Sequence, residues 1–195
     1  MKTIVWDVDD VLNDLMRGWF EQIWRAPHPS CTLNYGDIVK NPPCELLGIR
    51  QSDYLCSLDS FRQTDLARLQ PVAETLNWFE NHGHKCRHIA LTSVPLNAAH
   101  LSGGWVMQHF GRWIRSFNIV PSPRDGDKAV DYDHTKKEFL NWWGKADFIV
   151  DDSEFNIDTA RELGVTGILM PRPWNRNRQG CIKETLANLA KLIEA

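Results

Sequence analysis

Short apolar runs, separated by stretches with helical spacing, are the feature that most limits how this chain of 195 residues can fold. The stretch after the first run illustrates that spacing, with apolar side chains at Leu12, Leu15, Met16 and Trp19. Short apolar runs between helices are typical of strands that are buried on both faces of a parallel sheet. We therefore expect an α/β fold with a doubly wound parallel sheet. The expected strands cover residues 3–6, 89–91, 117–120, 148–150 and 168–170.

The segment from residue 28 to residue 70 interrupts this alternation. It contains Pro29 and the helix-breaking sequence Asn41-Pro42-Pro43, and only short stretches such as 52–60 have helical character. A structureless loop of this length is unusual in a compact domain, so we expect an inserted helical lid. We place a small helical cap, inserted after the first strand, at residues 15–70. The catalytic core then comprises residues 1–14 and 71–195.

Composition favours an ordinary globular protein that acts on a small molecule. Hydrophobic residues make up 43% of the chain and charged residues 24%, and the formal net charge is -3. A chain with this charge has no general electrostatic attraction to nucleic acid, so we expect no polymeric nucleic-acid partner. The five cysteines form no CxxC pair, and no apolar run approaches the roughly 20 residues of a membrane span. We expect a cytoplasmic protein with reduced thiols and no membrane association; the sequence is silent on its oligomeric state.

Polar residues follow the expected strands at the points where those strands end. In a parallel α/β sheet the carboxyl ends of the strands lie along one edge, where ligands bind. Residues that are distant in the sequence therefore converge at that edge. The converging residues are Asp7 and Asp9 after the first strand, Thr92 and Ser93 after the second, and Asp151 and Asp152 after the fourth.

Several carboxylates in one crevice require a positive charge among them. Two carboxylates about 5 Å apart repel by roughly 3 kcal/mol at an effective dielectric constant of 20. A divalent cation with oxygen ligands relieves this repulsion, and Mg²⁺ suits a site made of a few carboxylates, water and a substrate phosphate. Lys128, Lys136 and Lys137 precede the fourth strand, and any of them could add a further positive charge.

Four short motifs in this order resemble those of the haloacid dehalogenase (HAD) superfamily of phosphohydrolases. They are "DVDD" after the first strand, "IALTS" at the second, a lysine that opens a helix, and "IVDD" at the fourth. "DVDDVLND" and the later "PRPWNRN" are also similar to the 5'-nucleotidase and 5'(3')-deoxyribonucleotidase branch. The resemblance implies a Mg²⁺-dependent phosphomonoester hydrolase that acts through an aspartyl phosphate. The narrower similarity implies a nucleoside monophosphate as the substrate.

The resemblance also implies a role for each matching residue. Asp7 matches the nucleophile, and Asp9 matches the general acid and base. The side chains of Asp7 and Asp152 and the backbone carbonyl of Asp9 match the metal ligands, while Asp151 matches a supporting residue.

The phosphate-binding positions are less closely defined by the motifs. Thr92 matches the hydroxyl that holds a phosphate oxygen, and Ser93 takes its place if the strand ends one residue later. Lys136 is our choice for the motif lysine because it lies in the first turn of the expected helix. Lys128 and Lys137 remain alternatives.

Other interpretations of the same residues are a catalytically silent HAD-fold binding or regulatory protein, and a phosphotransferase that uses the same nucleophile. Intact Asp7, Asp9, Thr92 and Asp152 argue against a silent protein.

Several other polar residues near these motifs have a structural explanation. We expect Asp10 and Asp14 to serve the helix that follows them rather than the reaction. "HGHKCRH" at 82–88 invites a metal-site interpretation, but no second ligand cluster with zinc-like spacing follows it. Asn175, in "PRPWNRN", is either a loop residue or part of the crevice rim.

Overall fold

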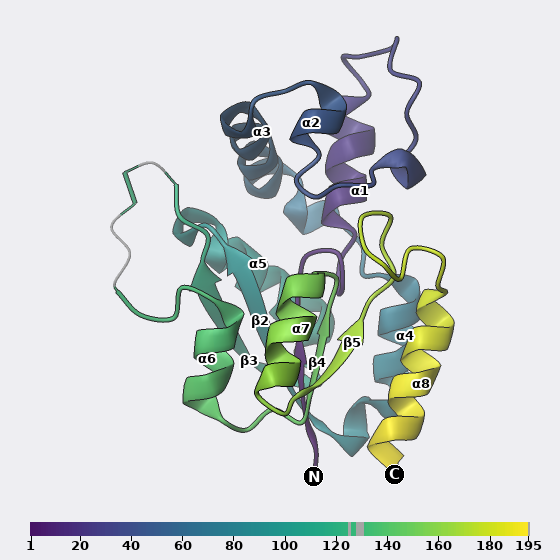
Figure 1. Cartoon of the computed structure of the whole chain (residues 1–195), viewed down its shortest axis with the longest axis vertical. Coiled ribbons are helices and arrows are strands. Elements are labelled where there is room, and N and C mark those ends of the chain that lie inside the picture. The colour runs from purple at the N-terminus through teal and green to yellow at the C-terminus, as the bar shows by residue number, and fades with distance from the viewer. Residues whose placement is uncertain (125, 128–130, 195) are drawn as a thin grey trace.

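A computed structural model, which describes residues 1–124, 126–127 and 131–194, contains a five-stranded, all-parallel sheet (Figure 1). The strand order is β3-β2-β1-β4-β5, so the first strand is the central one. This arrangement confirms the predicted doubly wound α/β fold. Strands β2 and β3 are longer than expected, and β5 begins earlier. The strands are β1 (Thr3–Trp6), β2 (Arg87–Val94), β3 (Ile114–Pro121), β4 (Phe148–Asp151) and β5 (Thr166–Leu169).

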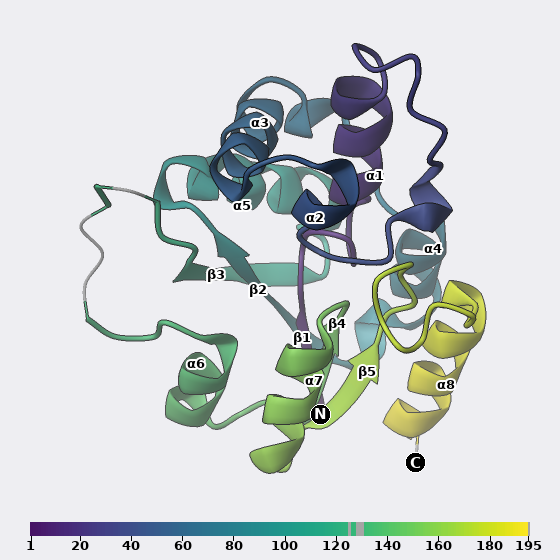
Figure 2. The same cartoon turned by 45° about the horizontal axis from the view of Figure 1, so that its top comes forward.

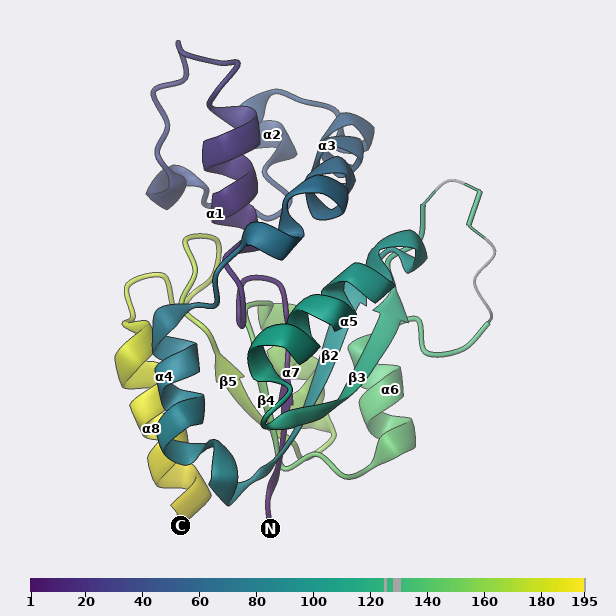
Figure 3. The ribbon, with the colours of Figure 1, turned by 180° about the vertical axis from the view of Figure 1, so that it is seen from behind.

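Helices cover both faces of the sheet, and each face has its own buried core (Figures 1 and 3). Side chains alternate along β1, so Val5 packs into the smaller core while Ile4 and Trp6 pack into the larger one. The smaller core includes side chains of α6 (Lys136–Trp143) and α7 (Glu154–Glu162). The larger core includes side chains of α4 (Ala73–His82), α5 (Leu96–Phe110) and α8 (Ile182–Glu194).

A group of short helices lies over the carboxyl end of the sheet (Figures 1 and 2). Buried Trp19, Phe20, Tyr54 and Phe61 of this group join the larger core. Residues 28–70 therefore contain helices, although the division into a core and a cap at residues 15–70 stays a prediction. The elements are α1 (Leu15–Trp19), η1 (Phe20–Trp24), η2 (Tyr35–Asp37), α2 (Cys44–Leu47), α3 (Gln51–Thr64) and η3 (Leu66–Arg68).

The turn that joins β1 to α1 is held by its own polar groups. Asp10 has a φ of 62°, a left-handed conformation that most side chains disfavour. Its carboxylate accepts a hydrogen bond from Met16 N at 3.0 Å, and its carbonyl accepts one from Arg172 Nε at 2.6 Å. Asp14 forms ion pairs with Arg17 at 2.9 Å and Arg172 at 3.1 Å. Both acids thus hold the start of α1 in place, as expected.

His88 of the "HGHKCRH" segment is a structural residue of β2 whose ring packs against Trp78 and Phe79 of α4. Trp6 Nε1 donates to His88 Nδ1 at 3.0 Å, and the Gly83 carbonyl lies 2.8 Å from His88 Nε2. Because an indole N–H can only donate, Nδ1 is the unprotonated nitrogen and Nε2 carries the hydrogen. Gly83 itself follows the last residue of α4 and begins the 3-10 helix η4 (Gly83–Lys85). Within the described residues, no metal-ligand cluster includes these histidines.

The helices of the described segments are all too short or too polar to cross a bilayer.

Candidate active site

Asp7 and Asp151 lie side by side at the carboxyl ends of β1 and β4, at the topological switch point of the sheet. The chain passes from β1 to β2 on one side of the central strand, while β4 pairs with β1 on the other. Asp7 N donates to the Val150 carbonyl at 2.9 Å, so the parallel ladder continues to the first residue after β1. Such a switch point is where ligands bind in open α/β sheets, because the two adjacent loops leave the sheet in opposite directions.

Lys136 joins these two carboxylates. Its Nζ lies 2.8 Å from Asp7 Oδ1 and 2.7 Å from Asp151 Oδ2, and its side chain is 3% exposed. It is the first residue of α6, whose N-terminus is capped by Thr135. Lys137 instead pairs with Glu162 on the surface at 2.6 Å. Of the predicted lysines, Lys136 is thus placed at the carboxylates; Lys128 lies outside the described residues.

Asp152 completes a group of three buried acids. Its Oδ2 accepts a hydrogen bond from Trp174 Nε1 at 2.7 Å. One ligand oxygen from each of Asp7, Asp151 and Asp152 can be chosen so that all lie within 4.8 Å of one another. Hard oxygen atoms at this spacing are the donor set that Mg²⁺ or a similar cation takes. No hydrogen bond from the described residues engages Asp7 Oδ2 or Asp152 Oδ1.

The charges of this group are not balanced by the protein alone. Burial raises the pKa of Asp7, and the neighbouring Asp151 and Asp152 add to the increase, against the attraction of Lys136. Burial likewise raises the pKa of Asp152 to about 8, with further increases from Asp151 and Asp10. Burial alone would lower the pKa of Lys136, but Asp151 and Asp7 outweigh it and raise that pKa. One ammonium faces three carboxylates, so the residues fit an additional cation.

Asp151 is held in place by neutral donors as well as by Lys136. Ser153 N donates to its Oδ1 at 2.8 Å, and Asn156 Nδ2 lies 3.1 Å from each of its oxygens. The residue is completely buried. These contacts leave little freedom for its carboxylate, which fits the predicted supporting role. That role stays a prediction.

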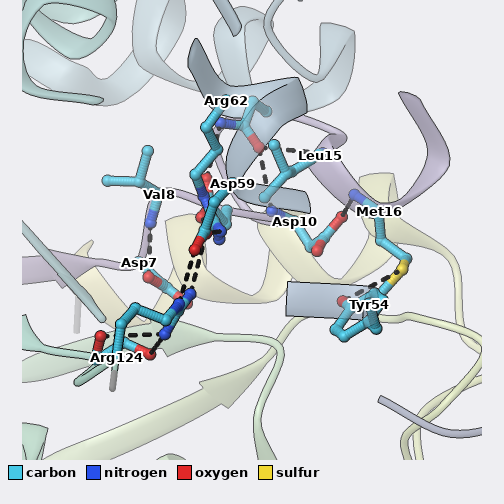
Figure 4. A network of polar contacts seen from close by, with 12 residues as sticks. Asp7, Val8, Asp10, Leu15, Met16, Tyr54, Asp59, Arg62 and Arg124 are labelled. Atoms are coloured by element: carbon cyan, nitrogen blue, oxygen red, sulfur yellow. Dashed lines mark hydrogen bonds and ion pairs between the residues drawn. The ribbon is translucent and has the colours of Figure 1, made fainter. Parts of the chain in front are cut away.

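Asp9 faces the short helices rather than the three buried acids. Its Oδ2 accepts a hydrogen bond from Arg62 Nη2 of α3 at 2.9 Å, and its Oδ1 accepts one from Asn13 at 3.1 Å. Arg62 also pairs with Asp59 at 3.1 Å. Asp59 lies between Arg62 and Arg124, which follows β3 and donates to both Asp59 oxygens at 2.6 and 2.9 Å (Figure 4). Arg62, Asp59 and Arg124 are not among the site residues predicted from the sequence.

Asp9 and Arg62 line a cavity of about 160 Å³ between the sheet edge and the helices above it. Asp7, Asp9, Asp152 and Ser93 line it from the side of the sheet. Thr92 is buried and does not line the cavity, whereas Ser93 is exposed to it. The two hydroxyls point to opposite sides of β2 because side chains alternate along a strand. The lining from the other side comprises Asp10, Leu15, Met16, Asn41, Tyr54, Leu58 and Arg62.

The loop after β5 supports the acids from behind. Asn175 Nδ2 donates to the carbonyls of Asp152 and Met170, at 2.8 Å each. Its Oδ1 accepts a hydrogen bond from Asn177 N at 3.0 Å. Asn175 is buried and does not line the cavity. Of the two alternatives for this residue, the structure therefore favours the loop residue.

Comparisons with solved structures show which known proteins share this fold. No protein-family model and no curated protein matches the sequence. A Lactobacillus delbrueckii protein assigned as a phosphoglycolate phosphatase is 15% identical, with a TM-score of 0.63 and 98% of each chain covered. A HAD family hydrolase from Deinococcus radiodurans, solved with phosphate and sodium, is 14% identical, with a TM-score of 0.59 and 100% of this chain and 96% of that chain covered.

A third solved structure, of a Bacillus subtilis protein assigned as a HAD hydrolase and bound to magnesium, is 16% identical. Its TM-score is 0.55, with 100% of this chain and 99% of that chain covered. At such low identities these similarities concern the fold, and they extend over almost the entire chain. The chain has the fold of HAD-superfamily hydrolases and phosphatases.

Proposed function

We propose that this protein is a Mg²⁺-dependent hydrolase of small phosphomonoesters that acts through a phosphoryl group carried on Asp7. The observation that carries the proposal is the position of Asp7. It lines a cavity at the switch point of the sheet, 2.8 Å from a buried lysine and beside two further buried carboxylates. Two structures with the same fold contain ions that such a site would bind, phosphate in one and magnesium in the other.

The chain's own residues account for a two-step displacement. The Asp7 carboxylate attacks phosphorus and the bond to the leaving oxygen breaks, which leaves an acyl phosphate on Asp7. Water then attacks the same phosphorus, and phosphate is released as Asp7 is regenerated. Lys136 holds Asp7 in position and offers positive charge to the phosphate oxygens. Mg²⁺, held by the side chains of Asp7 and Asp152 and the carbonyl of Asp9, would neutralise the charge on the transferring group.

Asp9 is the proposed general acid and base. It lines the cavity two residues after Asp7, where it can protonate the leaving oxygen and later accept a proton from the attacking water. We expect Asp9→Asn to lower turnover of a substrate with a poor leaving group, such as an alkyl phosphate, by roughly 10²-fold or more. Turnover of p-nitrophenyl phosphate, whose leaving group needs no proton, should fall much less. An equal loss on both substrates would contradict the acid role.

Phosphate binding is assigned to Ser93, Thr92 and Lys136. The exposure of Ser93 to the cavity supports it as the hydroxyl that contacts the phosphate. The Thr92 side chain is buried on the opposite side of β2 from Ser93. Thr92 could therefore contact the phosphate only through its backbone amide or after a shift of the strand end. We expect Ser93→Ala to raise the KM for phosphomonoesters more than Thr92→Val does.

The size of the cavity bears on the substrate. A volume of about 160 Å³ is below the roughly 300 Å³ at which ligand sites usually begin, so it favours a compact phosphomonoester. A nucleoside monophosphate would require α1 or α3 to move away from the sheet. A nucleoside monophosphate as substrate, and with it the 5'-nucleotidase branch, therefore stays a prediction.

Release of phosphate from a panel of sugar phosphates, carboxylated phosphomonoesters and nucleotides, with and without Mg²⁺, tests the proposal. Wild-type protein should release phosphate only with the metal, and Asp7→Asn should lower the rate by at least about 10³-fold. Asp53→Asn, at an exposed acid of α3, is the matched control and should retain full activity. Failure of wild-type protein on every substrate would favour a silent binding protein. Turnover that survives Asp7→Asn would rule out the covalent route.

A further inference from the structure

A second cavity, of about 510 Å³, lies between the short helices and the loop that follows β5. It shares no lining residue with the catalytic cavity. One wall comes from α1, η1 and η2, and the other comes from residues 171–182, which approach the short helices in all three ribbon views (Figures 1, 2 and 3). The proposed reaction uses none of these residues, so the cavity needs a separate explanation.

The lining of this second cavity is strongly cationic. Arg17, Arg25, Arg172 and Arg178 all contribute to it, against Glu21 as the one acid among its lining residues. Arg17 and Arg172 both pair with Asp14. Within residues 1–124, 126–127 and 131–194, no carboxylate lies within ion-pair distance of Arg25 or Arg178. The cavity therefore carries a net positive charge, which favours an anionic occupant.

Two buried polar groups in the lining lack hydrogen-bond partners among the described residues. They are Nη2 of Arg172 and the hydroxyl of Tyr35, in side chains that are 4% and 8% exposed. A buried donor without a partner costs about 1–3 kcal/mol, so such groups usually mark a missing ligand, ion or water. Burial strongly raises the pKa of Tyr35, so its hydroxyl keeps its proton and can donate. Both residues line the cavity.

The start of α8 adds a third contribution. Gly180 and Ile182 line the cavity, and α8 begins at Ile182 and runs for 13 residues. The amino end of a helix of this length carries a partial positive charge and unpaired backbone N–H groups. Phosphate groups are the anions that such helix ends, together with arginine side chains, bind in many proteins.

We propose that this cavity is a second ligand site, which binds a phosphate-bearing anion. Arg172 and Tyr35 hold the anion at the buried end, and the exposed Arg25 and Arg178 hold it at the opening. Tyr35 lies in η2 and Arg25 directly follows η1, while Arg172 and Arg178 belong to the loop after β5, so the bound anion joins the short helices to that loop. Arg172 also donates to the Asp10 carbonyl, which connects this site with the turn that carries Asp7 and Asp9.

Calorimetric titration with pyrophosphate, in EDTA and without Mg²⁺, tests the proposal. The full chain should bind pyrophosphate, and the double variant Arg25→Gln/Arg178→Gln should bind it at least tenfold more weakly at this site. Arg115→Gln, at an exposed arginine of β3, is the matched control and should bind as wild-type protein does. Arg25→Lys/Arg178→Lys retains the charge and should recover part of the affinity. Equal binding by the Gln double variant and wild-type protein would overturn the proposal, as would no binding by wild-type protein at millimolar pyrophosphate.

Hydrogen exchange locates the bound anion independently of affinity. Pyrophosphate should slow exchange of the backbone amides in residues 34–37 and 180–185 in wild-type protein but not in the double variant. Tyr35→Phe, which removes only the hydroxyl, should weaken binding several-fold without loss of the fold. Protection confined to residues 7–13 and 92–94 would place the anion in the catalytic cavity and overturn the proposal. ADP in a parallel titration identifies the source, because binding tighter than that of pyrophosphate indicates a nucleotide.

Discussion

Two buried ion-pair networks meet at the candidate catalytic cavity, and they connect different parts of the molecule. In the first, Lys136 joins Asp7 and Asp151. Lys136 begins α6, Asp7 directly follows β1 and Asp151 is the last residue of β4. In the second, Arg62 joins Asp9 of the sheet edge to Asp59 of α3, and Arg124 pairs with Asp59 from the far side. The first network is fixed by the sheet itself. The second exists only while α3 lies against the sheet edge, so it couples the position of the short helices to Asp9.

The first network is also more deeply buried than the outer part of the second. Side chains of the first are between 0% and 11% exposed, whereas Arg124 and Asp59 of the second are 19% and 16% exposed. Buried charges depend more on their partners than partly exposed charges, because water cannot replace a lost partner. Disruption of the first network should therefore cost more stability, and disruption of the second should mainly release the short helices.

The largest effect is expected from Lys136→Met. This change leaves Asp7 and Asp151 without their ammonium, and loss of one partner from a buried charge group typically costs about 3–5 kcal/mol. Urea unfolding at pH 7 in EDTA measures the change in the free energy of unfolding. Lys137→Met is the matched control, because its pair with Glu162 is on the surface and is worth less than about 1 kcal/mol. Added Mg²⁺ should recover part of the loss in Lys136→Met. Equal losses in the two variants would contradict the assignment of the first network.

A smaller effect, on the pH dependence of stability, is expected from His88. It must be distinguished from the pH dependence that Asp7 and Asp152 cause. Burial lowers the pKa of His88 to about 4, from an ordinary value near 6.5. The unfolded chain therefore binds a proton more readily than the folded chain between these values, and stability falls as the pH falls through that window. The full loss corresponds to about 3 kcal/mol. A proton on Nδ1 would also face the N–H of Trp6, so the protonated ring would lose that hydrogen bond.

Unfolding of His88→Gln and of the exposed control His84→Gln, each between pH 7 and pH 4.5, tests this prediction. His84→Gln should lose stability on acidification as wild-type protein does, and His88→Gln should lose much less. Without Mg²⁺, two of the buried acids at the cavity, Asp7 and Asp152, act in the opposite direction. Burial raises the pKa of Asp7 and Asp152, so the folded chain binds their protons more readily and gains stability as the pH falls. A parallel loss in both histidine variants would show that His88 does not control acid stability.

An intermediate cost of about 1–3 kcal/mol is expected from Arg62→Met, in the second network. Each of its carboxylates retains another partner, since Asn13 still donates to Asp9 and Arg124 to Asp59. Urea unfolding measures the loss, with Arg68→Met as the control in the same group of helices, because the Arg68 side chain is 82% exposed. A loss as large as that of Lys136→Met would contradict the distinction between the two networks.

The first network could be predicted from sequence because the topology of the sheet determines it. Asp7, Asp151 and Asp152 follow apolar runs, and the carboxyl ends of parallel strands must meet at one edge. Lys136 opens the helix before β4, so the same topology brings it to that edge. The choice between Thr92 and Ser93 was less well determined, because the position of the strand end decides it. Strand β2 extends to Val94, beyond the expected end at residue 91.

The second network could not be predicted, because its residues have no distinctive pattern. Asp59 and Arg62 are three residues apart on a helix, a spacing that recurs elsewhere in the chain as ordinary surface pairs. What distinguishes them is the packing of α3 against the sheet edge, which depends on contacts between distant segments. The spacing of Tyr54, Leu58 and Phe61 indicates which face of α3 is buried, but it does not indicate which distant segment that face packs against. The ordinary surface pairs are Arg50 with Asp53, Arg68 with Asp65 and Arg161 with Asp158.

The smallest effect on global stability is expected from Arg124→Gln, yet it is the most direct test of how α3 is held. Asp59 keeps its contact with Arg62, and Arg124 is partly exposed, so the free energy of unfolding should change by less than about 1 kcal/mol. The variant nevertheless loses the bidentate contact that ties α3 to the end of β3. Local opening of α3 should then become more frequent, and exchange of its backbone amides should accelerate about fivefold while those of β1 stay unchanged. Arg115→Gln, on β3 itself, should leave both sets of amides unaffected. Exchange of the α3 amides of Arg124→Gln at the wild-type rate would contradict this prediction. Apolar packing of Phe61 and Leu58 alone would then hold the helix, and the second network would only orient the Asp9 side chain.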